Sequence, residues 1–239
     1  MIPGRFTIGL CDVAVAVPQG FDQAGLAGAV AGLPAERAML RPERLKGRAL
    51  LIDPASGLSA ALSTRFRETV FRDVASERLG VVIASRYGSA AALKTFADRV
   101  RRGSSAPAAF AASGYNASAG FSAMAADAHG PSLALAGHGA SLRLAVQSAW
   151  LYIARGDADA MIVIAGESHP DGTDALAVGV AIKHPEAAPM IVDDADFALP
   201  AETDRPPAGP FSRFPWLWPG RRGLFAACTG EMMEAPNAG

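Results

Sequence analysis

Residues 137–141, Gly-His-Gly-Ala-Ser, contain the side chains of this sequence that are best placed to do chemistry. They separate an apolar run typical of a strand, 132–136, from an apolar run typical of a helix, 142–154. His138 could polarise a carbonyl group or act as a base, and Ser141 could act as a nucleophile. Each also has a purely structural interpretation, as a hydrogen-bonded histidine and as a helix N-cap serine.

One hypothesis is therefore a stand-alone acyl-thioester decarboxylase or hydrolase that uses His138 or Ser141. A decarboxylase of malonyl groups would need no cysteine. A hydrolase of the α/β type requires the pattern G-x-S-x-G, and neither GHGAS nor AGESH fits it. The sequence also shows no obvious base for Ser141.

A dinucleotide-binding module is a second hypothesis, because Gly137-x-Gly139 follows a strand and precedes a helix. The third glycine of that fingerprint is replaced by Leu142. The acidic residue that ends the next apolar run, Glu167, lies at the wrong distance. The match is partial, and we predict no cofactor.

A metal site is not indicated by the histidines. The four of them show no ligand spacing with one another; they are His129, His138, His169 and His184.

Composition excludes several classes of protein. Half of the 239 residues are hydrophobic and 19% are charged, which is typical of a globular protein and not of disorder. The net charge of −1 gives no basic footprint for nucleic acid or for an anionic membrane. No run is as long as a membrane span, and no basic leader precedes the first strand. Two cysteines, Cys11 and Cys228, give no disulfide framework, so we predict a cytoplasmic protein.

The elements expected around residues 137–141 alternate between strands and helices. Strands are expected at 5–17, 79–85, 132–136, in the run that ends at 167–168, at 175–183 and at 189–193. Helices are expected within 22–40 and at 59–73, 90–100 and 142–154, and a loop with a closely packed helix at 110–128. We expect residues 53–57 to form a loop before the second helix. This order predicts an α/β domain with a mixed sheet.

The helix expected at 142–154 is apolar on nearly every side. A helix of this kind is expected to be buried all round. Something beyond its own sheet should therefore cover it: the C-terminal segment, a second copy, or a different subunit.

The domain boundary is predicted near residue 199, where the composition changes. Residues 1–199 are expected to form the domain, and residues 200–239 a tail rich in proline and aromatic residues. Its aromatic residues could pack as a strap on the domain's own surface or dock another protein; they are Phe211, Phe214, Trp216 and Trp218.

Several segments together resemble the β-ketoacyl synthases. The run from Gly130-Pro131-Ser132 to Gly156-Asp157-Ala158-Asp159 keeps both ends of that family's nucleophile segment without a gap. Three other runs are similar to family motifs in the same order: LGVVIASRYGS (79–89), SAPAAFAASGYNASAG (105–120) and ALAVGVAIK (175–183). The resemblance covers about residues 5–197. It implies the N-terminal half of a thiolase-like fold, with a mixed β-sheet and helices on both faces.

The resemblance implies that Gly139 occupies the position of the family's catalytic cysteine. In these enzymes the turn holds the nucleophile at a helix N-terminus, which stabilises a thiolate. Glycine has no group that can attack a thioester. The half of the family that carries its histidines, or histidine and asparagine, is also expected to be missing. We therefore expect no catalytic residue and a pseudoenzyme.

The closest subgroup by resemblance is the short chain-length-factor type of subunit in aryl-polyene-like pathways. The implied partner is a full-length β-ketoacyl synthase, in a heterodimer whose acyl tunnel this chain would help to shape in fatty-acid or polyketide biosynthesis. Acyl carrier protein is a further possible partner, and a homodimer that binds acyl groups is the alternative. The residues expected at the tunnel or interface are Phe110, Tyr115, Phe121, Leu142, Val146 and Trp150. Plain core packing is the other interpretation of the aromatic ones.

Overall fold

A six-stranded mixed sheet is the centre of the molecule. The computed structural model describes residues 7–17, 53–137, 142–169 and 174–193, together with Phe214 and Leu217. The strands lie in the order β3-β2-β4-β5-β1-β6. Their bounds are β1 Thr7–Ala16, β2 Leu79–Ser85, β3 Ser132–Ala136, β4 Ala160–Ser168, β5 Ala175–Lys183 and β6 Met190–Asp193. The first three strands of that order, β3, β2 and β4, are parallel, and the remaining pairs are antiparallel.

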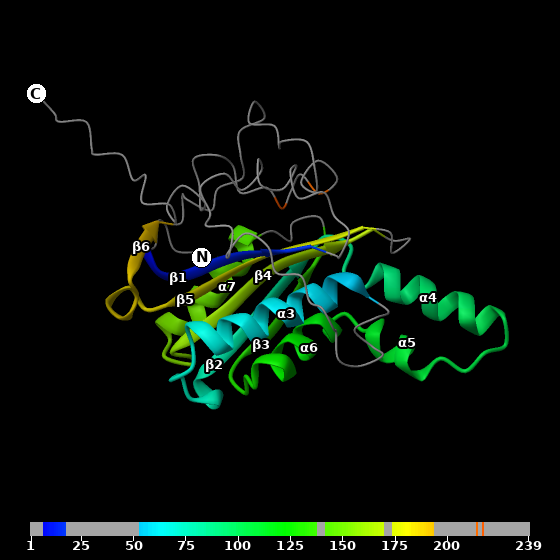
Figure 1. The fold of residues 1–239 in the computed structure, drawn as a ribbon, viewed down its shortest axis with the longest axis horizontal. Coiled ribbons are helices and arrows are strands. Elements are labelled where there is room, and N and C mark those ends of the chain that lie inside the picture. Colours follow the sequence, from blue (N-terminus) through cyan, green and yellow to red (C-terminus); the bar gives the residue numbers. More distant parts are fainter. Residues whose placement is uncertain are drawn as a thin grey trace, which may run out of the picture.

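Helices cover both faces of this sheet (Figure 1). Helices α3 and α6 lie on one face, where α3 packs against β1, β4 and β5 and α6 against β2 and β3. Helix α7 lies on the other face, over β2 and β4. The bounds are α3 Pro54–Thr69, α4 Ala90–Arg101, α5 Pro107–Ala112, α6 Ala117–Ala126 and α7 Leu142–Ala154, with short 3-10 helices at Ser76–Arg78 and Pro185–Ala187. The predicted α/β class with helices on both faces is confirmed.

The two-sided arrangement follows from the handedness of the crossovers. From β2 the chain passes through α4, α5 and α6 to β3 on one side of β2, and from β3 it passes through α7 to β4 on the other side. Right-handed crossovers in opposite directions place their helices on opposite faces of a sheet. This is why α6 and α7 face each other across β2.

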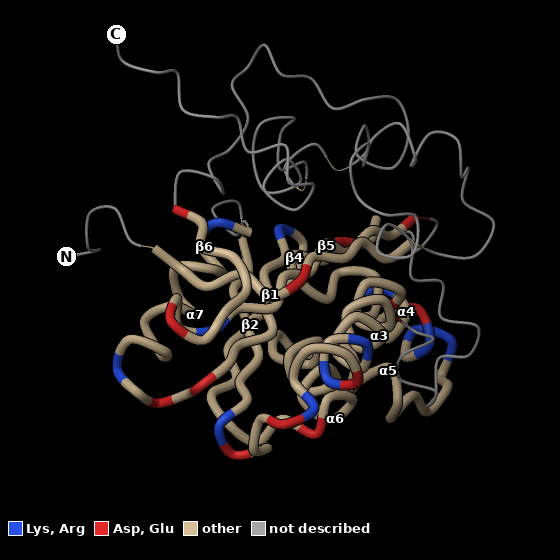
Figure 2. The backbone as a smooth tube through the Cα atoms, turned by 60° about the vertical axis from the view of Figure 1, so that its left-hand side comes forward, with Lys and Arg blue, Asp and Glu red and all other residues tan. Residues whose placement is uncertain are grey.

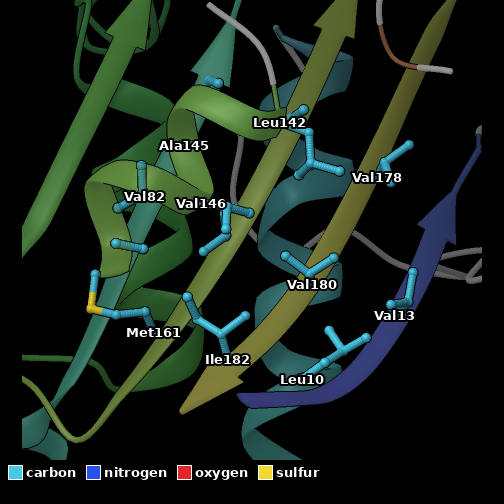
Figure 3. Close-up of a cluster of buried hydrophobic side chains, with 14 of the residues drawn as sticks. Leu10, Val13, Val82, Leu142, Ala145, Val146, Met161, Val178, Val180 and Ile182 are labelled. Atoms are coloured by element: carbon cyan, nitrogen blue, oxygen red, sulfur yellow. The ribbon is translucent and has the colours of Figure 1, made fainter. Parts of the chain in front are cut away.

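Each face of the sheet has its own hydrophobic core. On the α7 face, Leu142, Val146 and Ile153 of the helix pack on Val82 and Met161 of the strands. Figure 3 shows Leu142, Ala145 and Val146 turned toward β2 and β4, with Val178, Val180, Ile182, Leu10 and Val13 continuing the same face across β5 and β1. On the opposite face, Leu58, Leu62 and Phe66 of α3 pack against alanines and β-branched residues of the strands.

Strand β1 changes its alternation at a β-bulge. Leu10 pairs with Ile182 of β5, but Asp12 pairs with Ala181, so Cys11 is the extra residue. Before the bulge the even-numbered residues face α7, and after it the odd-numbered residues do, beginning with Val13. Asp12 is thereby placed on the α3 face, where its carboxylate lies 3.5 Å from the guanidinium of Arg65.

Helix α3 approaches the sheet closely because two strand positions opposite it lack a side chain. A Cβ added at Gly179 of β5 would lie 2.8 Å from Phe66 of α3, and one at Gly166 of β4 would lie 2.8 Å from Ser59 Oγ. Phe66 and Ser59 are fully buried. The glycines therefore set the distance between the helix and the sheet.

The sequence-based element bounds need two corrections. Residues 54–57, expected in a loop, form the first turn of α3, because Pro54 is well suited to the first helical position. The segment expected at 110–128 contains the end of α5 and the whole of α6. On the outer side of helix 142–154, Leu151 is 46% exposed and Ala154 is also exposed, so the expected cover over that side stays a prediction. A single helix on an open face buries only the side turned to the sheet. The helix expected at 22–40 lies outside the described residues.

Helices α4 and α5 project beyond the sheet as a pair (Figure 1). The ring of Phe96 on α4 lies 5.5 Å from that of Phe110 on α5. Large apolar side chains remain exposed on both helices, among them Leu93, Val100 and Phe110. No helix in the described ranges is long and apolar enough to cross a membrane.

We predict that Gly179→Ala destabilises the fold and that Gly120→Ala does not. The Gly179 methyl group would overpack Phe66 and lower the free energy of unfolding by about 1–3 kcal/mol. A Cβ at Gly120 of α6 meets nothing within 4 Å, so Gly120→Ala should raise it by about 0.5–1 kcal/mol through helix propensity. Urea unfolding of both variants measures these changes. Equal effects would contradict the close approach of α3.

Candidate functional site at the carboxyl ends of β2, β3 and β4

The carboxyl ends of three parallel strands meet at one edge of the sheet. The chain leaves β2 at Ser85 toward α4 on one face, and it leaves β3 at Ala136 toward α7 on the other. Where neighbouring loops leave to opposite faces, the ends of the strands border a crevice that commonly binds ligands. The loop 85–89 and the turn that begins at Gly137 therefore define the candidate site.

A buried carboxylate holds the loop 85–89 in place. Glu167, near the end of β4, is fully buried. Its carboxylate accepts hydrogen bonds from the Ser85 hydroxyl at 2.7 Å, the Arg86 N–H at 2.7 Å and the Tyr87 N–H at 3.1 Å. Hydrogen bonds from several donors are what allow a carboxylate to remain in the interior. Glu167 thus fixes the backbone where β2 ends.

The same loop contacts two further segments. The Gly137 N–H donates to the Ser85 carbonyl oxygen at 3.1 Å, which joins the loop to the end of β3. Gly88 has φ +58°, and its N–H donates to Ser85 Oγ at 2.8 Å. The Ser89 hydroxyl donates to the Gly114 carbonyl oxygen at 3.0 Å, between α5 and α6. Hydrogen bonds therefore join the loop to β4, to the end of β3 and to the segment between α5 and α6.

A second buried carboxylate lies beside the first. Asp53, directly before α3, is fully buried and accepts hydrogen bonds from the hydroxyls of Ser56 and of Ser168, the latter at 2.9 Å. Ser56 Oγ also lies 2.5 Å from Ser118 Oγ of α6. This network joins the start of α3, the end of β4 and α6. Because Ser168 follows Glu167, the two carboxylates hold opposite sides of one strand end.

Burial raises the pKa of Asp53 above its ordinary value of 3.8, since desolvation disfavours the charged form. The hydrogen bonds from Ser56 and Ser168 oppose that rise, but burial is the larger effect. Asp53 is therefore positioned to clamp α3 to β4 and has no exposed face toward the crevice.

The cysteine that the structure describes lies far from this edge. Cys11 is on β1, and β4 and β5 lie between β1 and β2 in the sheet. Burial raises the pKa of its thiol, with Lys183 partly opposing the rise. A neutral, half-buried thiol is a poor nucleophile. Cys11 cannot replace a nucleophile at the end of β3.

The residues predicted to do chemistry, His138, Gly139 and Ser141, lie outside the described residues. The elements on either side are in place, because β3 ends at Ala136 and α7 begins at Leu142. The predicted strand before them and the predicted helix after them are therefore confirmed. Their roles stay predictions.

The residues predicted at a tunnel or interface fall into two groups. Phe110 and Tyr115 are 65% and 78% exposed, and Phe121 is half-buried on α6. Leu142 and Val146 are buried against the chain's own sheet, while Trp150 is half-buried and stacks on His184 with 5.9 Å between ring centroids. In the part of the chain that the structure describes, no cluster of histidine, cysteine and acidic residues could hold a metal.

Two important residues of this edge were missed by sequence reasoning, Glu167 and Asp53. A signal for each is present. Glu167 is the charged residue in an otherwise apolar strand, and an aspartate before a proline is typical of a helix start. What the sequence does not show is that both carboxylates converge on the end of β4.

The family model described as β-ketoacyl synthase, N-terminal domain, matches residues 70–205, which is more than half of the chain. The chain belongs to the β-ketoacyl synthase family. That the turn after β3 holds the family's nucleophile position stays an expectation of the resemblance. No curated protein matches the sequence.

Solved structures share this ketosynthase fold at low identity. The chain is similar to the structure described as the ishigamide ketosynthase/chain length factor, with a TM-score of 0.60 and 19% identity over 77% of this chain and 64% of that one. It is also similar to the ketosynthase ApeO in complex with its chain length factor ApeC from Xenorhabdus doucetiae, with a TM-score of 0.50 and 19% identity over 75% and 79%. The chain spans less than two thirds of the ishigamide chain.

We predict that Asp53→Asn changes how the stability of the fold depends on pH. Because burial raises the Asp53 pKa, the folded chain retains a proton that the unfolded chain releases above pH 3.8. Stability from this group is full below that pH and is lost as pH rises through the raised pKa. Asparagine has no proton to lose at this position. In urea unfolding, the free energy of unfolding of Asp53→Asn should therefore rise relative to that of the wild type as pH rises.

Asp127→Asn is a control of opposite sign. The Ser76 hydrogen bond is the main cause that lowers the pKa of the exposed Asp127. The free energy of unfolding of the wild type should therefore rise relative to that of Asp127→Asn as pH rises through the acid range. If both variants shift in the same direction, the assignment of Asp53 as a carboxyl destabilised by burial is wrong.

Proposed function

We propose that this chain is a non-catalytic, ketosynthase-like subunit of the chain-length-factor type. It pairs with an active β-ketoacyl synthase and shapes the acyl tunnel of that partner in fatty-acid or polyketide-type biosynthesis. The observation that carries the proposal is the apolar edge strand β3, which leads directly into the turn where Gly139 stands in the nucleophile position by family resemblance.

Strand β3 has an open side. It pairs with β2 and, within the described ranges, with no other strand. Its sequence, SLALA, contains no charge and no proline, which are the usual devices that protect an edge. An unprotected edge next to the candidate site favours the addition of a strand from another protein.

The hydrogen-bonding pattern shows which residues face the open side. The Pro131 carbonyl oxygen accepts from the Val81 N–H at 2.8 Å, and the Gly137 N–H donates to Ser85. In a parallel strand the residues that bond one neighbour alternate. The N–H and C=O groups of Ala134 therefore point away from β2.

Apolar side chains also remain exposed on the helices beside this edge. Met124 of α6, which packs on β2 and β3, is 72% exposed. Phe110 and Tyr115 are exposed to a similar degree. Large apolar side chains that are exposed to this degree are typical of a surface that another protein covers. This exposure supports an interface role for Phe110 and Tyr115 over packing within the chain's own core.

The described relatives support the class of partner. Two similar structures are described as a ketosynthase with a chain length factor, and a third, AntDE:AntF, with a TM-score of 0.50 and 14% identity, as an acyl-carrier protein in complex with its ketosynthase. By analogy, the partner of this chain is a β-ketoacyl synthase, and acyl carrier protein is the carrier of the growing chain. The analogy rests on the shared fold.

We predict that Ala134→Pro abolishes binding of a co-expressed β-ketoacyl synthase while the chain still folds. Proline removes the outward N–H and leaves the bonds to β2 intact, so circular dichroism of the purified variant should match the wild type. Co-purification on a tagged ketosynthase measures the binding.

Ile191→Lys is the matched control. Ile191 is 55% exposed on β6, the strand at the opposite edge of the described sheet. Co-purification should be unchanged for this variant. Loss of binding in Ile191→Lys but not in Ala134→Pro would place the partner at the wrong edge for the proposal.

We also predict that the volume of the side chain at position 110 changes product length. If Phe110 limits the tunnel, Phe110→Ala lengthens the acyl products of the reconstituted complex and Phe110→Trp shortens them. Mass spectrometry of the released products measures the distribution. Ile191→Ala, a change at the opposite edge, should leave it unaltered. If the complex stays intact and neither Phe110 variant changes the length of the products, tunnel shaping by Phe110 is contradicted.

A further inference from the structure

Helix α7 covers only half of its face of the sheet. It packs on β2 and β4, whereas the same face continues across β5, β1 and β6. The side chains of that second half are nonetheless 0–3% exposed. They are Ile8, Leu10, Val13, Val15, Val178, Val180, Ile182 and Val192. Figure 3 shows Val178, Val180, Ile182, Leu10 and Val13 on the part of the face away from α7.

Two residues far along the chain belong to the core of this face. Phe214 and Leu217 are 2% and 3% exposed and are members of the same hydrophobic cluster. The Leu217 N–H donates to the Phe214 carbonyl oxygen at 2.9 Å, so one turn of backbone presents both side chains together. Apart from residues of the strands and α7, and from Val17 and Ala158, they are the described members of the cluster.

We propose that Phe214 and Leu217 form an intramolecular anchor that closes the β5–β1–β6 half of the α7 face. The occupant of this apolar face is thus a segment of the same chain, not a second copy and not a partner subunit. A phenylalanine and a leucine suit a surface made of valine, leucine and isoleucine side chains, which offers no polar group for recognition.

The length of the intervening chain is compatible with closure in cis. Strand β6 ends at Asp193 beside β1, and twenty residues, 194–213, lie between it and Phe214. At about 3.3 Å per extended residue, that length exceeds the roughly 10 Å across three neighbouring strands several times over. Tethering at this range gives an effective concentration in the millimolar range, which a separate copy does not reach.

Closure of this face has a consequence for assembly. An open apolar face of this size would be a second association surface, competing with the edge at β3. With the anchor in place, the α7 face of β5, β1 and β6 is withdrawn from contact with other proteins. The inference does not depend on the identity of any partner.

Thiol labelling tests the anchor directly. In a background with Cys11→Ser and Cys228→Ser, Leu217→Cys should react with a thiol reagent at least a hundredfold more slowly than Phe110→Cys, whose parent side chain is 65% exposed. Protection of Leu217→Cys should be the same at micromolar and nanomolar protein. Labelling of Leu217→Cys at the rate of Phe110→Cys would overturn the anchor, and protection that is lost on dilution would assign the segment to a second copy.

Unfolding equilibria provide a second measurement that does not depend on cysteine variants. Phe214→Ala removes a buried aromatic ring and should increase the unfolding equilibrium constant by about a hundredfold or more. Phe110→Ala is the matched control at an exposed phenylalanine and should change it less than about threefold. Equal effects would overturn the proposal. A Phe214→Ala chain that fails to fold, while Phe110→Ala folds, supports it.

Discussion

The position of β3 outside β2 is the constraint on which the rest of the structure depends. One crossover leads from β2 out to β3, and the next returns over β2 to β4, so the turn after β3 lies where loops leave to opposite faces. The same step puts an apolar strand at the edge of the described sheet. The candidate site and the candidate interface therefore both depend on the position of β3. A change in this strand affects both of them.

Two buried carboxylates give that edge its rigidity. Glu167 fixes the loop after β2, and Asp53 fixes the start of α3, with both acting through the last two residues of β4. The charged positions otherwise lie mainly on the outer sides of helices and in loops around the largely uncharged strands (Figure 2). The partners of these carboxylates are loop amides and serine hydroxyls, so they hold the backbone of this edge whichever residue occupies position 139.

The sequence was sufficient to predict the element order, the mixed sheet and the family, because apolar runs and small-residue turns are local signals. Residues 132–136 and 142–154 were placed correctly for this reason. What covers the outer side of helix 142–154 stays a prediction, since an apolar composition does not say which neighbours surround a helix. The convergence of Asp53 and Glu167 on the end of β4 was also missed, because Asp53 and its partner Ser168 are 115 positions apart and meet only through the strand order. The chemistry of residues 138–141 stays a prediction.

The bulge at Cys11 divides β1 into two segments of opposite phase. The bulge puts Asp12 on the α3 face near the guanidinium of Arg65; if the strand alternated regularly through Cys11, Asp12 would turn toward the valines and leucines of the α7 face. The backbone of Cys11 makes this bulge, and its sulfur atom takes no part in it. A substitution at Cys11 leaves the phase of both segments unchanged, whereas a one-residue insertion or deletion at another position within β1 turns one segment over to the opposite face.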